Sequence, residues 1–74
     1  MKPFPDQLIR IVAAGGGVII NAGDYFPDIL IRIAAAAANS GATIIIKDAH
    51  KLFPDVQVRI AVAGNGKVVF DFNN

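Results

Sequence analysis

Residues 26–47 read FPDILIRIAAAAANSGATIIIK and contain, in one run, the signals of a helix, a stop and a strand. Pro27 suits the first position of a helix, where its missing N–H costs nothing, and the helix dipole favours the negative charge of Asp28 in the first turn. Five consecutive alanines, the strongest helix formers, follow. Gly41 provides a stop, and the β-branched run after it is typical of a strand. The stretch predicts a helix over 27–39 and a strand over 43–47.

The opening triplet of this stretch occurs three times, which indicates an internal repeat. Phe-Pro-Asp stands at residues 4–6, 26–28 and 53–55, and an arginine follows each aspartate four positions later. Each copy continues with small residues, a glycine-containing break and a β-rich run. The repeats are bounded at residues 4–25, 26–52 and 53–74. By analogy with the middle copy, the pattern predicts helices over 5–14 and 54–63 and strands over 18–22 and 67–72.

The third copy also allows a different structure. Val56, Val58, Ile60 and Val62 stand at alternate positions, which is a strand period. With the turn-forming residues 64–66 that follow, this copy fits a β-hairpin as well as a helix and a strand. The repeated Pro-Asp start signal and the helical pattern of the middle copy favour the helix.

The order helix then strand, repeated three times, predicts an α/β fold. Crossovers between parallel strands are right-handed, so consecutive helices lie on the same face of a sheet. The expected architecture is a three-stranded parallel sheet in the order 1-2-3, with the helices layered on one face. This pattern resembles a short helix–strand, α/β solenoid-like repeat protein, as found among designed repeat proteins and fragments of longer repeat arrays. The resemblance covers the whole chain, points to no named family and implies no functional residues.

The composition excludes several classes of protein. The chain of 74 residues predicts a single domain over 1–74, and with no cysteine and one histidine we expect no disulfide, no metal site and no cofactor. A net charge of +1 does not fit a nucleic-acid partner. The uncharged stretches are shorter than the roughly 20 residues of a spanning helix, and the N-terminus has no signal-peptide layout. We expect a cytoplasmic protein that binds neither nucleic acid nor membrane.

The loops after the strands hold the candidate ligand-binding residues. In α/β folds ligands bind outside the carboxyl ends of the strands, and these loops carry Asp24, Asp48, His50 and Lys51, with residues 71–74 at the same edge. His50 oriented by Asp48 is a candidate base. No nucleophile accompanies it, and polar residues are ordinary in exposed loops. A solvated loop is therefore the stronger interpretation, and no catalytic residue is assigned.

Three further patterns each have a structural explanation. The glycines at residues 15–17 follow a helix instead of preceding one, which is the wrong order for a phosphate loop and the usual place of a helix stop. Three arginines in register suggest an anion-binding ladder, but local ion pairs with the aspartates explain their spacing; they are Arg10, Arg32 and Arg59. The repeated phenylalanines are expected to be buried plugs where each loop meets its helix; they are Phe4, Phe26 and Phe53.

The apolar strands predict self-association. Helices on one face leave the other face of the sheet uncovered, and runs such as Ile44-Ile45-Ile46 place apolar side chains on both faces. Edge strands also invite another chain, and a chain this small without a disulfide or metal needs added stability. We expect a non-enzymatic, self-associating module that provides structure or a binding surface, with a closed, symmetric dimer as its state. The alternative is a small ligand-binding or enzymatic domain that uses the loops around Asp24 and His50.

Overall fold

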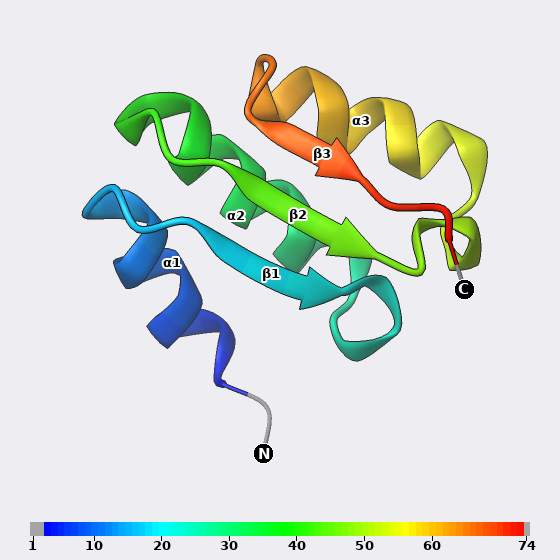
Figure 1. The fold of residues 1–74 in the computed structure, drawn as a ribbon, viewed down its shortest axis with the longest axis horizontal. Coiled ribbons are helices and arrows are strands. Elements are labelled where there is room, and N and C mark those ends of the chain that lie inside the picture. The colour runs from blue at the N-terminus through cyan, green and yellow to red at the C-terminus, as the bar shows by residue number, and fades with distance from the viewer. Residues whose placement is uncertain (1–2, 74) are drawn as a thin grey trace.

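Helices and strands alternate along the chain as three helix–strand units. The structure is a computed structural model that describes residues 3–73, so Asn74, the last residue of the third predicted repeat, lies outside it with residues 1–2. Two short 3-10 turns, η1 (Ala22–Asp24) and η2 (Ala49–Lys51), precede the second and third helices. The helices are α1 (Pro5–Ala13), α2 (Pro27–Ser40) and α3 (Pro54–Gly64), and the strands are β1 (Val18–Asn21), β2 (Ile44–Lys47) and β3 (Val68–Phe70) (Figure 1).

Each helix begins at the proline of Phe-Pro-Asp. The preceding phenylalanine has extended backbone angles and makes no side-chain cap, and the proline takes the first helical position. Helix α2 ends where Gly41 adopts φ = 82°, a left-handed conformation that glycine enters without a Cβ clash. Helix α3 ends on Asn65 with φ = 46°, since asparagine tolerates this region better than most residues. These local signals place the helix bounds within a residue or two of the predicted ones.

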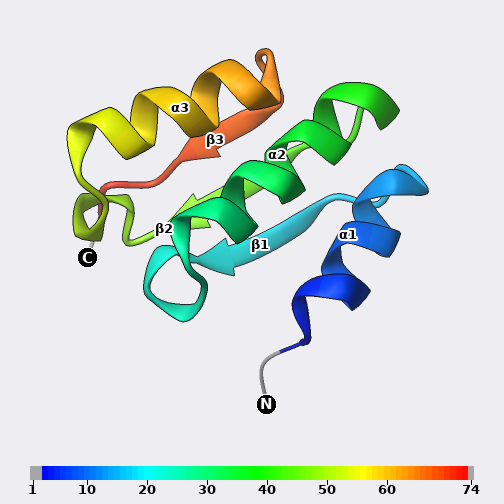
Figure 2. The same ribbon diagram turned by 180° about the vertical axis from the view of Figure 1, so that it is seen from behind.

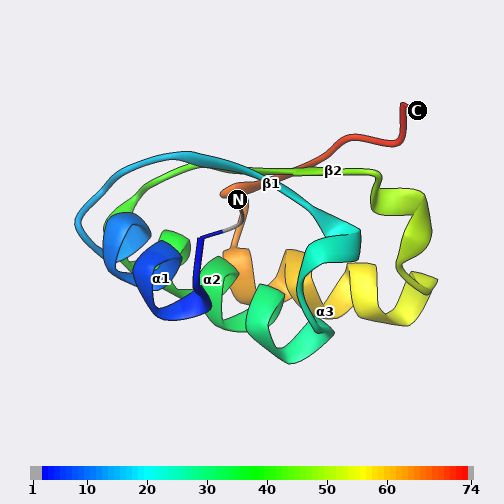
Figure 3. The same ribbon diagram turned by 90° about the horizontal axis from the view of Figure 1, so that it is seen from below.

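The strands form one parallel sheet in the order β1-β2-β3. Val18 of β1 lies beside Ile44 of β2, which lies beside Val68 of β3, so the three units are in register. All three helices cover one face of the sheet, and no described element covers the other (Figures 2 and 3). The α/β class, the parallel sheet, the strand order and the one-sided helix layer predicted from the sequence are confirmed.

The third unit is a helix followed by a strand, so the hairpin alternative is wrong. Residues 54–64 are helical, and β3 pairs in parallel with β2. The alternating apolar residues arise from the place of α3 in the helix layer. It is the last of the three helices, so one of its sides has no neighbouring helix. Ile60 is fully buried on its covered side, whereas Val58 and Val62 are 62% and 74% exposed.

All three strands are shorter than predicted, β2 by one residue, and at the ends of β1 and β3 side chains bond to their own backbone. β1 ends at Asn21, whose side-chain oxygen accepts a hydrogen bond from the N–H of Gly23 at 2.8 Å and starts the turn η1. The ladder of β3 extends to Asp71, whose N–H donates to the carbonyl of Ile46 at 2.8 Å. The Asp71 carboxylate then accepts from the N–H of Asn73. Such local bonds compete with strand pairing.

The core lies between the helix layer and the inner face of the sheet. The middle unit dominates it because that unit has neighbours on both sides: α2 packs against both α1 and α3, and β2 pairs with both other strands. Every buried side-chain nitrogen and oxygen among the described residues has a hydrogen-bond partner. The largest fully buried side chains are Leu30, Ile33, Ile44, Ile46, Ile60 and Val12.

Two polar side chains join neighbouring elements at the margin of this core. The Ser40 hydroxyl, at the end of α2, donates to the carbonyl of Val12 in α1 at 2.6 Å. The Gln57 amide, in α3, donates to the carbonyls of Ala49 and Leu52 at 3.0 and 3.1 Å. The carbonyls of Val12 and Ala49 each accept a backbone N–H as well, so the side-chain bonds are additional links between neighbouring elements.

Candidate functional site

Side chains from two loops meet beyond the carboxyl ends of β1 and β2. The Asn21 amide donates to Asp48 Oδ2 at 2.5 Å, and Lys51 Nζ lies 3.8 Å from the same oxygen. Asn21 and Lys47 are register partners in the sheet, which brings Asp48, the next residue, close to Asn21. The structure therefore brings together two of the predicted ligand-binding residues, Asp48 and Lys51, and adds Asn21. Both partners hold the Asp48 carboxylate within the loop.

The other two predicted residues, His50 and Asp24, lie in the turns η2 and η1. His50 is exposed, and within residues 3–73 it makes no hydrogen bond with Asp48 that would orient it as a base. Asp24 is also exposed and lines, together with Asn21, a pocket beside α1. No group of three or more histidines, cysteines, aspartates or glutamates in that range is placed to hold a metal ion. The terminal Asn74 of the same edge lies outside the described residues. That these four residues bind a ligand stays a prediction.

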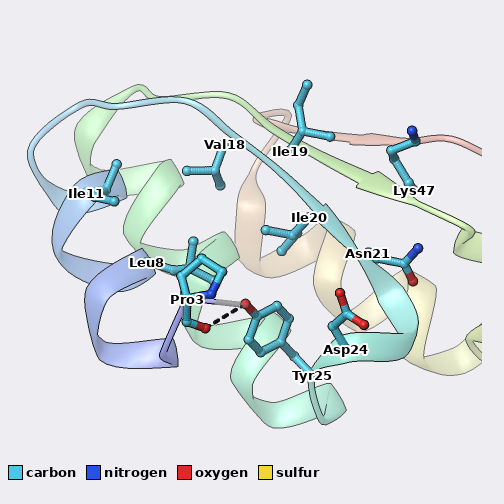
Figure 4. Close-up of a pocket in the computed structure, with 10 residues that line it drawn as sticks. All are labelled: Pro3, Leu8, Ile11, Val18, Ile19, Ile20, Asn21, Asp24, Tyr25 and Lys47. Atoms are coloured by element: carbon cyan, nitrogen blue, oxygen red, sulfur yellow. Dashed lines mark hydrogen bonds between the residues drawn. The ribbon is translucent and has the colours of Figure 1, made fainter. Parts of the chain in front are cut away.

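A pocket of about 480 Å³ opens between α1 and β1 (Figure 4). Val18 and Ile20 point from β1 to the side of the helix, while Ile19 points to the opposite side of the strand. The Tyr25 hydroxyl borders the pocket and donates to the carbonyl of Pro3 at 2.8 Å. The lining is mostly apolar, and the pocket lies at the free edge of the sheet, where the first unit has no neighbour.

The three phenylalanines are exposed, so the prediction that they are buried plugs is wrong. Phe4, Phe26 and Phe53 are 79%, 79% and 76% exposed. Each occupies the N-cap position, one residue later than the position from which a hydrophobic staple packs onto its helix. In the second and third units the residue before the phenylalanine is the more buried one: Tyr25 is half-buried and Leu52 is 9% exposed.

The predicted arginine–aspartate pairs form in one unit of the three. Arg10 Nε lies 3.3 Å from Asp6 Oδ2, with both side chains about 80% exposed. Among the described residues, Arg32 and Arg59 make no such pair with the aspartates of their own helices. Exposed pairs of this kind contribute little to stability. The aspartate and arginine positions are a solvated outer face of the helix layer.

The glycines at residues 15–17 follow the C-terminus of α1, as predicted. Gly15 has φ = 98°, which allows the chain to turn from the helix back toward the sheet. The negative end of the helix dipole disfavours an anion there.

The uncovered face of the sheet carries an apolar row across all three strands. Ile19, Ile45 and Val69 are register partners, so their side chains lie next to one another. Ile19 is 65% and Val69 49% exposed, and Ile45 between them is half-buried. We call these three residues the sheet-face row. Residues two positions before or after the row share its face. Apart from Gly17 they are polar: Thr43, Lys67, Asn21, Lys47 and Asp71.

Comparison of this chain with protein-family models, curated proteins and solved structures finds no match.

Two general properties of the surface remain. None of the helices in residues 3–73 has the length and apolar character that crossing a bilayer requires. Contiguous exposed apolar surface on a folded chain commonly marks an interaction site. The sheet-face row is contiguous, because its three members come from separate strands and are held adjacent by the sheet itself.

Proposed function

We propose that this protein is a non-enzymatic module that self-associates as a dimer and, in that form, provides structure or a binding surface. The observation behind the proposal is the sheet-face row, which is in register on three strands. The helices of residues 3–73 all lie on the other face of the sheet. Burying apolar surface in a contact stabilises the complex by about 25 cal/mol for each Å² removed from water. A second copy laid on this face removes the row from water in both chains.

The dimensions of the molecule suit such a contact. The chain measures 28 × 28 × 20 Å, and Figure 1 looks down its shortest axis onto the broad face. That outline is close to the ~800 Å² that each partner buries in an interface of standard size. An apolar centre with a polar rim is also the usual composition of such interfaces, and here polar residues flank the row on both sides.

Charge on the rim favours one orientation of the two copies. Lys67 and Asp71 flank β3, two residues before and after Val69. A two-fold axis that runs along the row turns the partner's strands antiparallel and places each Lys67 opposite an Asp71. An axis along the strands instead places Lys47 opposite its own copy, and like charges that face each other are unfavourable. We therefore propose the antiparallel arrangement.

The loop cluster supports a role without catalysis. The Asp48 carboxylate is held by Asn21 and Lys51, and a group held in this way serves the loop in which it lies. His50, the candidate base, has no orienting carboxylate among the described residues, and an orienting partner is part of most acid–base sites.

The test is the solution mass of a chain with a polar sheet face. The double variant Ile19→Thr/Val69→Thr keeps β-branched side chains, which suit strands, and replaces apolar contact with hydroxyls. We expect its dimer dissociation constant to rise at least about tenfold, a change of about 1.4 kcal/mol. Sedimentation velocity over a concentration series measures this shift, and circular dichroism confirms that the fold is kept.

Val62→Thr is the matched control, because Val62 is 74% exposed in the helix layer, away from the sheet face. It makes a similar chemical change and should leave the mass unaltered. If the double variant keeps the mass of the parent chain at every concentration, the sheet face is not the contact.

A further inference from the structure

The side of each helix that faces the next unit carries apolar residues at fixed positions. Counting from the proline, these are the fifth and eighth residues, which helical spacing places on one side. In α2 they are Ile31, which is half-buried, and Ala34, which is fully buried. In α3, which has no helix after it, Val58 is 62% exposed and Ala61 is exposed. The two positions that are half-buried or buried in α2 are therefore exposed in α3.

The first unit is open on the opposite side. The seventh residue of each helix faces the preceding unit: Ile33 and Ile60 are 0% exposed, whereas Ile11 in α1 is 40% exposed. The order of the helices explains the difference in exposure, because α2 and α3 each have a helix before them and α1 has none among the described residues. The pocket between α1 and β1 lies beside Ile11 and is lined also by Leu8 (Figure 4). It opens on the side where the second and third units have a predecessor.

The backbone at the two ends is complementary as well. β1 and β3 are the edges of the parallel sheet, and an edge strand offers one row of unpaired N–H and C=O groups. β1 is open where a preceding strand would pair, and β3 is open where a following strand would pair. A second β1 beside β3 continues the internal register of Val18, Ile44 and Val68 by one strand.

We infer that a second copy of this chain stacks head to tail on the first, with its α1 and β1 against α3 and β3. The contact repeats the interface by which the units already pack within the chain. It joins two different surfaces, so it builds rings or filaments, unlike the closed contact expected from the sequence. It uses the edges of the sheet and not the sheet-face row, and it therefore stands or fails separately from the proposed dimer.

The experiment mixes two chains, each blocked at one end. Both carry Ile19→Thr/Val69→Thr, which removes the sheet-face contact. One also carries Ile11→Glu, which blocks the pocket end, and the other carries Val58→Glu, which blocks the α3 end; glutamate keeps helix propensity in both. Each variant alone should have the mass of one chain, and the equimolar mixture should form a species of twice that mass. The average mass of the Ile19→Thr/Val69→Thr chain without either glutamate should rise with concentration.

Ala35→Glu, on the exposed side of α2, is the matched control. Added to the Ile19→Thr/Val69→Thr chain, it should leave the rise of average mass with concentration unchanged. Ile11→Gln replaces Ile11→Glu if circular dichroism shows that the charged variant loses its fold. A mixture that stays at the mass of one chain overturns the inference. A two-chain species formed by the Ile11→Glu variant alone also overturns it, because α3 would then meet α3 of the other copy.

Discussion

Replacing Ile33 by alanine is expected to lower the free energy of unfolding by about 2–5 kcal/mol. Ile33 is 0% exposed and lies in α2, the helix with neighbours on both sides. The truncation removes buried methyl groups and leaves a cavity that the surrounding side chains fill only in part. A domain of this length has a total stability of roughly 4–11 kcal/mol. The loss is therefore a large fraction of the total and should be plain in a urea or thermal melt.

Asp28→Ala, in the same helix, is the matched comparison. Asp28 is exposed in the first turn and makes no ion pair with Arg32 among the described residues. Its loss removes a favourable charge at the positive end of the helix dipole, which is worth a few tenths to about 1 kcal/mol. A melting series in which Asp28→Ala is the worse of the two would contradict the assignment of inside and outside on α2.

The second large effect is expected at Ile60. Ile60→Ala should cost about 2–5 kcal/mol because the side chain is fully buried under α3. Val58→Ala, two residues earlier, should change the free energy of unfolding by no more than about 0.5 kcal/mol. Val58 is 62% exposed, and alanine is the better helix former. Chemical denaturation of both variants, repeated at two protein concentrations, separates folding from association.

This pair of substitutions discriminates between the two structures that the sequence allows for the third unit. In a strand, residues two apart share one face, so Val58 and Ile60 would be buried or exposed together. In a helix they lie on different sides. Similar losses in the free energy of unfolding for the two variants would favour the hairpin. A large loss for Ile60→Ala alone supports the helix.

The features that could be predicted from the sequence are those that local signals determine. Pro27 and Asp28 mark a helix start, and Gly41 a helix stop, through the backbone of their own segment. Once three such units are known, the handedness of crossovers leaves one topology for the sheet. The strand order and the helix layer follow without knowledge of any long-range contact.

The features that could not be predicted depend on which flank of a unit is covered. Val58 and Ile31 hold the same position in their helices, yet one is exposed and the other half-buried. The strand-like alternation in α3 is a consequence of that difference. The exposure of Phe26 depends on a single step of position, because it is the N-cap residue, and Tyr25 before it is the one that turns inward.

The loop cluster was predicted in part for a similar reason. Asp48 and Lys51 are close in the chain, so their proximity needed only a turn. Asn21 is far from them in sequence and reaches Asp48 because the sheet register places it beside Lys47. The sequence did hold one signal for Asn21, an asparagine two residues before a glycine at a strand end, which is typical of a side chain that bonds to its own turn.

Sedimentation equilibrium of the unaltered chain tests self-association, the central claim, most directly. The chain has a mass of 7.8 kDa. In dilute solution we expect a species with the mass of two chains, formed through Ile19, Ile45 and Val69 on the uncovered sheet face, and a rising average mass at higher concentration as ends stack. A stable species with the mass of one chain at every concentration would contradict both contacts.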